Sequence, residues 1–153
     1  MIKNVVVIND FAYINGGAGK VAIMSALALA DQGINVFFFC GMGPVCDELK
    51  SSKIKIVSTD QGDITQENRM KGLLQGINNK FAEKKLYRLL QQLDKKSTIV
   101  HCHAWSKILS SSIFKATKKA HVPVVITGHD YGTVCPLSLI HISEPTRHAQ
   151  ISY

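Results

Sequence analysis

The stretch Gly16-Gly17-Ala18-Gly19-Lys20 has the composition of a phosphate-binding loop, because it joins a β-branched run to a helix-forming segment. Glycines let backbone N–H groups approach an anion, and a helix N-terminus adds a partial positive charge. The stretch is not a Walker A loop, which would need Gly at Ile14 and Ser or Thr at Val21. A tight turn without a ligand is the alternative. We expect phosphate contacts from Gly16, Gly17, Gly19 and Lys20.

Three histidines follow or lie in strand-like apolar runs and could hydrogen-bond to a ligand. His101 and His103 alternate along one run, so their side chains point to the same side. Two imidazoles can hold a metal, but no carboxylate or thiol stands nearby at ligand spacing, so we predict no metal site. Packed core histidines are the alternative. His129 follows the run 123–126 and is the candidate catalytic residue, since it can donate to a substrate hydroxyl or phosphate.

Two neighbours of these histidines are further candidate ligand contacts. Trp105 is either a ligand platform or a lid on the helix that follows it. Asp130 is either a ligand contact or a cap for backbone N–H groups in a turn.

These candidates need a scaffold that brings separate loops together. The pattern predicts strands at residues 5–10, 34–40, 54–57, 98–105 and 123–126, and helices at 18–32, 46–50, 66–93 and 106–120. Continuous β-branched or aromatic runs are typical of strands buried on both faces, and a helical spacing of apolar residues is typical of amphipathic helices. The alternation predicts an α/β fold, a Rossmann-like doubly wound parallel sheet with helices on both faces. Ligands of such a fold bind beyond the carboxyl ends of the strands.

Composition limits the compartment and the partners. The chain has 153 residues, which favours one domain, and 46% hydrophobic residues can bury a core. No apolar run is long enough for a secretory signal or a membrane span, and the cysteines form no C-x-x-C pair, so we expect a cytoplasmic protein with reduced thiols.

The net charge of +7 favours anionic partners. We interpret the basic region 69–96 as a candidate peripheral membrane contact, with a solvated face as the alternative, and expect no nucleic acid.

The segment 137–153 matches no element that this fold needs. Residues 137–147 can be encoded by a sequence that looks like the transposase-type adapter of short-read libraries, and residues 151–153 fit the start of the flanking adapter arm. A natural C-terminal tail is the alternative. We therefore expect residues 1–136 to be an incomplete domain and residues 137–153 to be a non-native tail.

Residues 1–136 resemble the N-terminal, acceptor-binding lobe of a family 4 glycosyltransferase of the GT-B type. The resemblance lies in NDFAYINGGAGKVAIMSALALADQG, FFFCGMGPVCDEL, TIVHCHAWSKILSSSIFKAT and VVITGHDYGTVCP. Its most specific parts are the Gly-Gly loop and the H-D-Y-x-x-x-C-P run. The resemblance implies two Rossmann-like lobes that face each other across a cleft, with the nucleotide-sugar donor held mainly by the other lobe.

The resemblance also implies roles for the candidate residues. Gly16 and Gly17 would lie against the donor diphosphate, and His129 would contact the donor sugar. His103, Trp105 and Asp130 would lie on the acceptor side. Family members are typically retaining and work without a metal, so helix ends and basic groups would stabilise the departing diphosphate. The nucleotide-sugar would be a co-substrate of the reaction. The acceptor would be a saccharide or lipid-linked molecule.

The chain departs from the family pattern, and other classes stay open. The donor lobe, with its paired-glutamate E-x7-E motif, is missing, so we expect the chain alone to be inactive. A dinucleotide-dependent oxidoreductase would use Gly17, Gly19 and Ala22 as G-x-G-x-x-A, but no acidic residue closes the strand 34–40. A non-enzymatic nucleotide-binding or receiver module is the other alternative; receivers need clustered carboxylates, and Asp10 stands alone.

Overall fold

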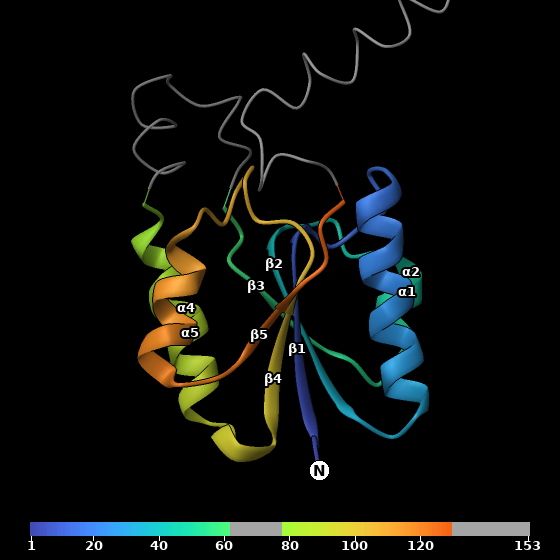
Figure 1. Cartoon of the computed structure of the whole chain (residues 1–153). Coiled ribbons are helices and arrows are strands. Elements are labelled where there is room, and N and C mark those ends of the chain that lie inside the picture. Colours follow the sequence, from blue (N-terminus) through green and yellow to red (C-terminus); the bar gives the residue numbers. More distant parts are fainter. Residues whose placement is uncertain (62–77, 130–153) are drawn as a thin grey trace, which may run out of the picture.

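The computed structural model describes residues 1–61 and 78–129, in which strands and helices alternate (Figure 1). The strands are β1 (Asn4–Phe11), β2 (Asn35–Met42), β3 (Lys55–Ser58), β4 (Thr98–Cys102) and β5 (Val124–Ile126). The helices are α1 (Gly17–Asp31), α2 (Asp47–Lys50), α4 (Lys80–Gln91) and α5 (Ser112–Ala120), with a 3-10 turn at Lys95–Ser97. This order confirms the predicted alternation.

The described strands form one parallel sheet in the order β3-β2-β1-β4-β5. β1 lies at the centre, paired with β2 on one side and β4 on the other. Figure 1 shows α1 and α2 on one face of the sheet and α4 and α5 on the opposite face. The predicted fold class, a Rossmann-like parallel sheet with helices on both faces, is therefore confirmed. Because the strands are parallel, all their carboxyl ends meet at one edge.

Alternation along the central strand gives the sheet two hydrophobic cores. Val6 and Ile8 pack in the core that contains α4 and α5, whereas Val7 belongs to the core that contains α1. Successive side chains of a strand point to opposite faces, which explains the division. Ala22 and Ala26 of α1 are fully buried, and their small size lets α1 lie close to the sheet.

The predicted boundaries after β4 are wrong. The strand predicted for residues 98–105 ends at Cys102, and the helix predicted for 106–120 begins only at Ser112. The carboxylate of Asp10 accepts hydrogen bonds from three consecutive backbone N–H groups between them, which fixes a loop there. Ser110 has a φ of 60°, a left-handed conformation that interrupts a right-handed helix.

Helix boundaries elsewhere follow recognisable signals. Gly33 has a φ of 82° just after α1, as expected for the residue that ends a helix. The helix predicted for residues 66–93 is observed only as α4: Asn78 and Asn79 are not helical, which corrects the prediction there, and the predicted portion 66–77 lies outside the described residues. The side chain of Asn79 caps α4 by accepting the N–H of Ala82.

Two further findings concern the described cysteines and the lengths of the described helices. Cys40, Cys46 and Cys102 are free thiols, and burial raises the pKa of Cys40 to about 11 and also raises the pKa of Cys102. The thiol form of these two residues is therefore retained at neutral pH. Within residues 1–61 and 78–129, no helix has both the length and the apolar composition to cross a bilayer.

Candidate functional site

The carboxyl ends of the strands bring the main predicted candidates to one edge of the sheet. β1 leads into the glycine loop, β4 leads into His103, and β5 leads toward His129. The N–H of His103 donates to the carbonyl of Ile8 over 2.9 Å, which continues the pairing of β4 with β1. The glycine loop and His129 therefore lie at the same edge, with the end of β4 between them.

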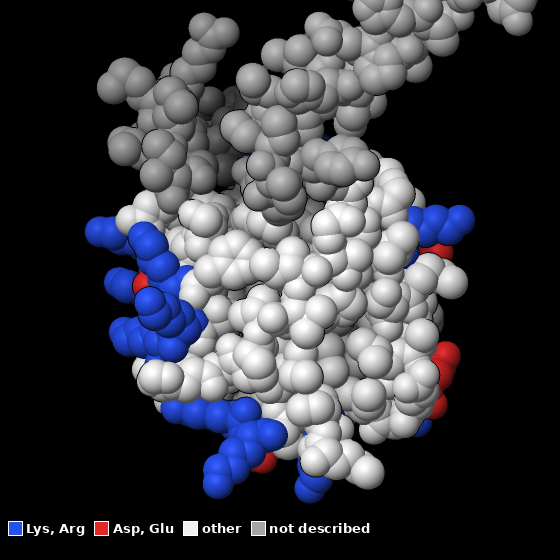
Figure 2. All heavy atoms as spheres, in the orientation of Figure 1, with Lys and Arg blue, Asp and Glu red and all other residues white. Residues whose placement is uncertain are grey.

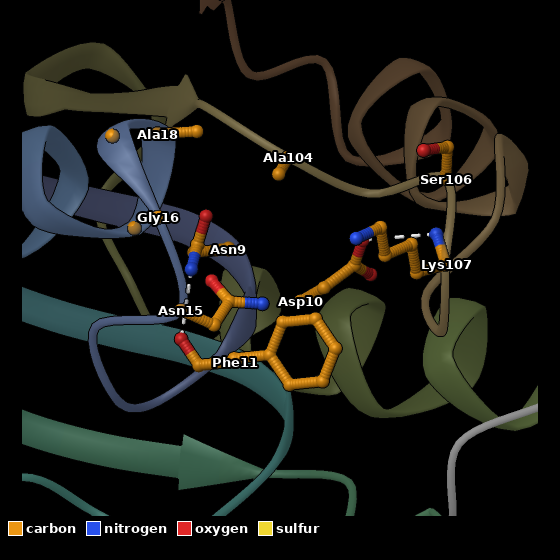
Figure 3. Close-up of a pocket in the computed structure, with 11 residues that line it drawn as sticks. Asn9, Asp10, Phe11, Asn15, Gly16, Ala18, Ala104, Ser106 and Lys107 are labelled. Atoms are coloured by element: carbon orange, nitrogen blue, oxygen red, sulfur yellow. Dashed lines mark hydrogen bonds between the residues drawn. The ribbon is translucent and has the colours of Figure 1, made fainter.

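A cavity of about 190 Å³ opens at this edge between the glycine loop and the loop after β4 (Figure 3). It is lined by Asn9, Asp10, Phe11, Asn15, Gly16, Gly17, Ala18, Gly19, Ala104, Ser106 and Lys107. The first turn of α1 forms one wall, and Ser106 and Lys107 lie opposite (Figure 3). Pockets for whole drug-sized ligands are larger, roughly 300–1,000 Å³. This cavity therefore fits a phosphate or diphosphate group rather than a complete nucleotide-sugar.

The N-terminus of α1 lines this cavity without a side-chain cap. Its N-cap residue, Gly16, has a φ of 140°, which L side chains rarely adopt. A Cβ on Gly17 would meet no atom of the described residues within 4 Å, so the backbone there is open. An anion in the cavity would find backbone N–H donors and the positive end of the helix dipole.

Gly17 and Gly19 differ in what a side chain would meet, and this difference tests the geometry of the loop. A Cβ on Gly19 would lie 2.9 Å from Oδ1 of Asn15 and 3.2 Å from the carbonyl oxygen of Tyr13. Gly19 lies in α1, so a gain in helix propensity partly offsets this overlap, and we expect Gly19→Ala to lower the free energy of unfolding by about 0.5–2 kcal/mol. Gly17→Ala should leave it unchanged or raise it by up to about 1 kcal/mol. Urea unfolding measures both, and equal effects would contradict this loop geometry.

Asp10 holds the loop after β4 against the end of β1. Its carboxylate accepts the N–H of Lys107 over 2.9 Å and the N–H groups of Ile108 and Leu109 over 3.0 Å each. Burial raises the pKa of Asp10, while these three hydrogen bonds and the charge of Lys107 oppose the rise. Both carboxylate oxygens are engaged, so Asp10 is a positioning residue that places Ser106 and Lys107 at the cavity.

Asn9 contributes an unused acceptor to the cavity wall. The residue is 1% exposed, and its Nδ2 donates to the carbonyl of Phe11 over 2.8 Å. Its Oδ1 has no partner among the described residues. Buried polar atoms are paired in the great majority of cases, so this oxygen suits a hydroxyl or N–H of a ligand. Sequence reasoning missed Asn9; the available signal was a polar residue at the end of a buried β-branched run.

The three histidines form one contact cluster next to the cavity residue Ala104. The rings of His101 and His103 lie on the same side, as predicted, with centroids 4.2 Å apart. Nδ1 of His103 is 3.0 Å from Nε2 of His129, so one ring donates to the other. Nε2 of His101 is 2.8 Å from Oγ1 of Thr127. The cluster thus links the ends of β4 and β5.

Burial keeps two of these rings neutral. His103 is 4% exposed, and desolvation, together with the neighbouring His101 and His129, lowers its pKa to about 4. Desolvation also lowers the pKa of His101. Near pH 7 both rings are therefore neutral, each with one N–H and one bare nitrogen. They can orient a ligand-binding group, but they do not supply positive charge.

The remaining predicted contacts lie away from the cavity or outside the described residues. Lys20 is exposed on α1 and does not line the cavity. Trp105 packs edge-on against Phe114 of α5, with ring centroids 5.1 Å apart, which agrees with a lid on the helix rather than an open platform. Asp130 lies outside the described residues. The described part of the chain holds no group of three or more His, Cys, Asp or Glu that could bind a metal.

Together these features define an α/β lobe in which an uncapped helix N-terminus lines a cavity at the carboxyl edge of a parallel sheet. The family model described as Glycosyltransferase Family 4 matches residues 15–149, so the chain belongs to this family. No curated protein matches the sequence significantly. The family match does not favour the oxidoreductase alternative. The matched range also includes residues 137–149, and the adapter origin of the tail stays a prediction.

Proposed function

We propose that the chain binds the diphosphate of a nucleotide-sugar in the cavity beside α1, and that the whole protein transfers the sugar to a saccharide or lipid-linked acceptor. The observation that carries this proposal is the uncapped N-terminus of α1, with Gly17 open at a phosphate-sized cavity. Lys107 lines the opposite wall and would add a positive charge. Helix dipole and cation together stabilise a diphosphate leaving group without a metal.

The histidine cluster would act on the sugar side of the same edge. His129 is exposed, and its Nε2 is paired with His103, so its other ring nitrogen would face the donor sugar. We keep His103 and Asp130 as acceptor-side candidates and regard Trp105 as packing support for that loop. A lipid-linked acceptor would bring the enzyme to a membrane surface, in agreement with the predicted peripheral contact.

Residues 1–136 would form one lobe of a two-lobe enzyme. The E-x7-E motif of the donor lobe does not occur in the 153 residues. The chain would therefore bind a diphosphate weakly and would not catalyse transfer by itself.

Inorganic diphosphate and UDP test the binding site on this chain directly. In ¹H–¹⁵N NMR titrations we expect saturable shifts of the amides of residues 16–19, because these N–H groups line the proposed site. Gly17→Val should weaken binding by about tenfold or more by filling the cavity, a loss of about 1.4 kcal/mol. The control Ala28→Val places the same side chain at an exposed position of α1 and should bind as the unmodified chain does. Absence of shifts at residues 16–19, or equal binding by both variants, would refute the assignment.

The complete gene tests the reaction. Transfer or hydrolysis of a nucleotide-sugar should fall sharply in Gly17→Val and in His129→Ala while both variants stay folded. Near-normal activity in both would count against these two roles.

A further inference from the structure

The positive charge of the described residues is concentrated on one helical layer. α4 carries Lys80, Lys84, Lys85 and Arg88, and α5 carries Lys115, Lys118 and Lys119. Glu83 is the one carboxylate within these two helices, so they have a net charge of +6. α1 and α2 on the opposite face hold two lysines and three carboxylates, a net charge of −1. Figure 2 shows the blue side chains gathered over α4 and α5.

Most of these cations are exposed and point away from the sheet. We define the α4–α5 face by its exposed cations, Lys80, Lys84, Arg88, Lys115, Lys118 and Lys119. Residues 80, 84 and 88 are spaced by four, so they share one side of α4. The one salt bridge of the described residues joins Lys50 and Asp47 on α2, so no cation of the α4–α5 face forms an ion pair with a described carboxylate. Its charge is available to an external partner.

An exposed aromatic side chain lies among these cations. Phe81 is 54% exposed, and Nζ of Lys85 lies 5.8 Å from the centre of its ring. Phe81, Lys84, Lys85 and Arg88 line a shallow hollow of about 280 Å³ on α4. An amphipathic helix with lysines and an outward aromatic residue suits the interface of a bilayer, where the ring enters the headgroup region and the ammonium groups meet lipid phosphates.

We propose that the α4–α5 face docks on an anionic lipid bilayer. The exposed cations are five lysines and one arginine spread over the outer side of two packed helices. Ammonium groups act as point charges that suit a field of headgroups, whereas nucleic-acid recognition favours the bidentate guanidinium of arginine. The proposal does not depend on diphosphate binding, because the cavity residues lie outside α4 and α5.

Vesicle co-sedimentation at low and physiological salt tests this surface on the full chain. We expect the chain to bind phosphatidylcholine vesicles that contain phosphatidylglycerol at about a third of the lipid, and to ignore pure phosphatidylcholine vesicles. The triple variant Lys84→Gln, Lys115→Gln and Lys118→Gln should bind at least about tenfold more weakly. Its matched control, Lys3→Gln, Lys50→Gln and Lys53→Gln, removes the same charge from exposed positions outside this face and should bind nearly as well as the unmodified chain.

Phe81→Ser supplies a second test that leaves the charge unchanged. Loss of vesicle binding in this variant, with unchanged circular dichroism, would support entry of the ring into the bilayer. Equal losses in the two triple lysine variants would overturn the proposal, because the effect would then follow net charge alone. Binding to a short DNA duplex, with none to the anionic vesicles, would also overturn it.

Discussion

Acidification from pH 6.5 toward pH 4 should remove about 2–3 kcal/mol of folding free energy through His103. The folded chain lowers the pKa of this ring from 6.5 to about 4, so the unfolded chain binds the proton more tightly. The stabilisation is complete above pH 6.5 and is lost as the pH falls through this interval. Urea unfolding at a series of pH values measures the slope.

His103→Asn isolates this contribution. The amide Nδ2 can take the place of Nδ1 as a donor to His129, and the amide does not titrate. The loss of folding free energy between pH 6.5 and pH 4 should therefore be about 2–3 kcal/mol smaller in this variant than in the unmodified chain. His121→Asn is the matched control, since His121 is exposed at the left-handed C-cap of α5, with a φ of 56°, a conformation that Asn tolerates. A full slope retained in His103→Asn would show that the buried ring does not cause the acid sensitivity.

The sheet could be predicted because its signals are local. Continuous apolar runs mark strands buried on both faces, and the glycine after the first long helix marks the end of that helix. Parallel pairing then places the glycine loop and His129 at one edge without further information. The same-side placement of His101 and His103 follows from the two-residue period of a strand and holds in the structure.

The cavity could not be predicted, because long-range hydrogen bonds build its second wall. Residues 106–109 have a helix-compatible composition, but the carboxylate of Asp10, nearly a hundred residues earlier, accepts the N–H groups of residues 107–109 and holds them in a loop. That loop brings Lys107 to the cavity, whereas Lys20, which the glycine-rich pattern favours, stays exposed on α1. A pattern in the sequence reports local conformation and cannot show which distant carboxylate will bind a given backbone segment.

Asp10→Ala should therefore lower the free energy of unfolding by about 3–5 kcal/mol, the largest effect expected of a single substitution at this edge. The variant leaves the N–H groups of Lys107, Ile108 and Leu109 without their acceptor, and the last two are buried. Asp10→Asn should lower the free energy of unfolding by less, because the amide keeps one oxygen as acceptor. The amide also carries no negative charge, so it avoids the cost of burying a charge, the same cost that raises the pKa of Asp10. Asp31→Ala, at the exposed end of α1, should change stability by less than about 0.5 kcal/mol.

Hydrogen exchange distinguishes this role from general destabilisation. If Asp10 fixes the loop after β4, the amides of residues 107–109 should exchange faster in Asp10→Asn under native conditions, while the amides of β1 and β2 keep their protection. Uniform acceleration across the sheet would instead mean that the carboxylate supports the whole fold. Selective acceleration together with weaker diphosphate binding would show that the Asp10 hydrogen bonds hold the second wall of the cavity in the position that an anion requires.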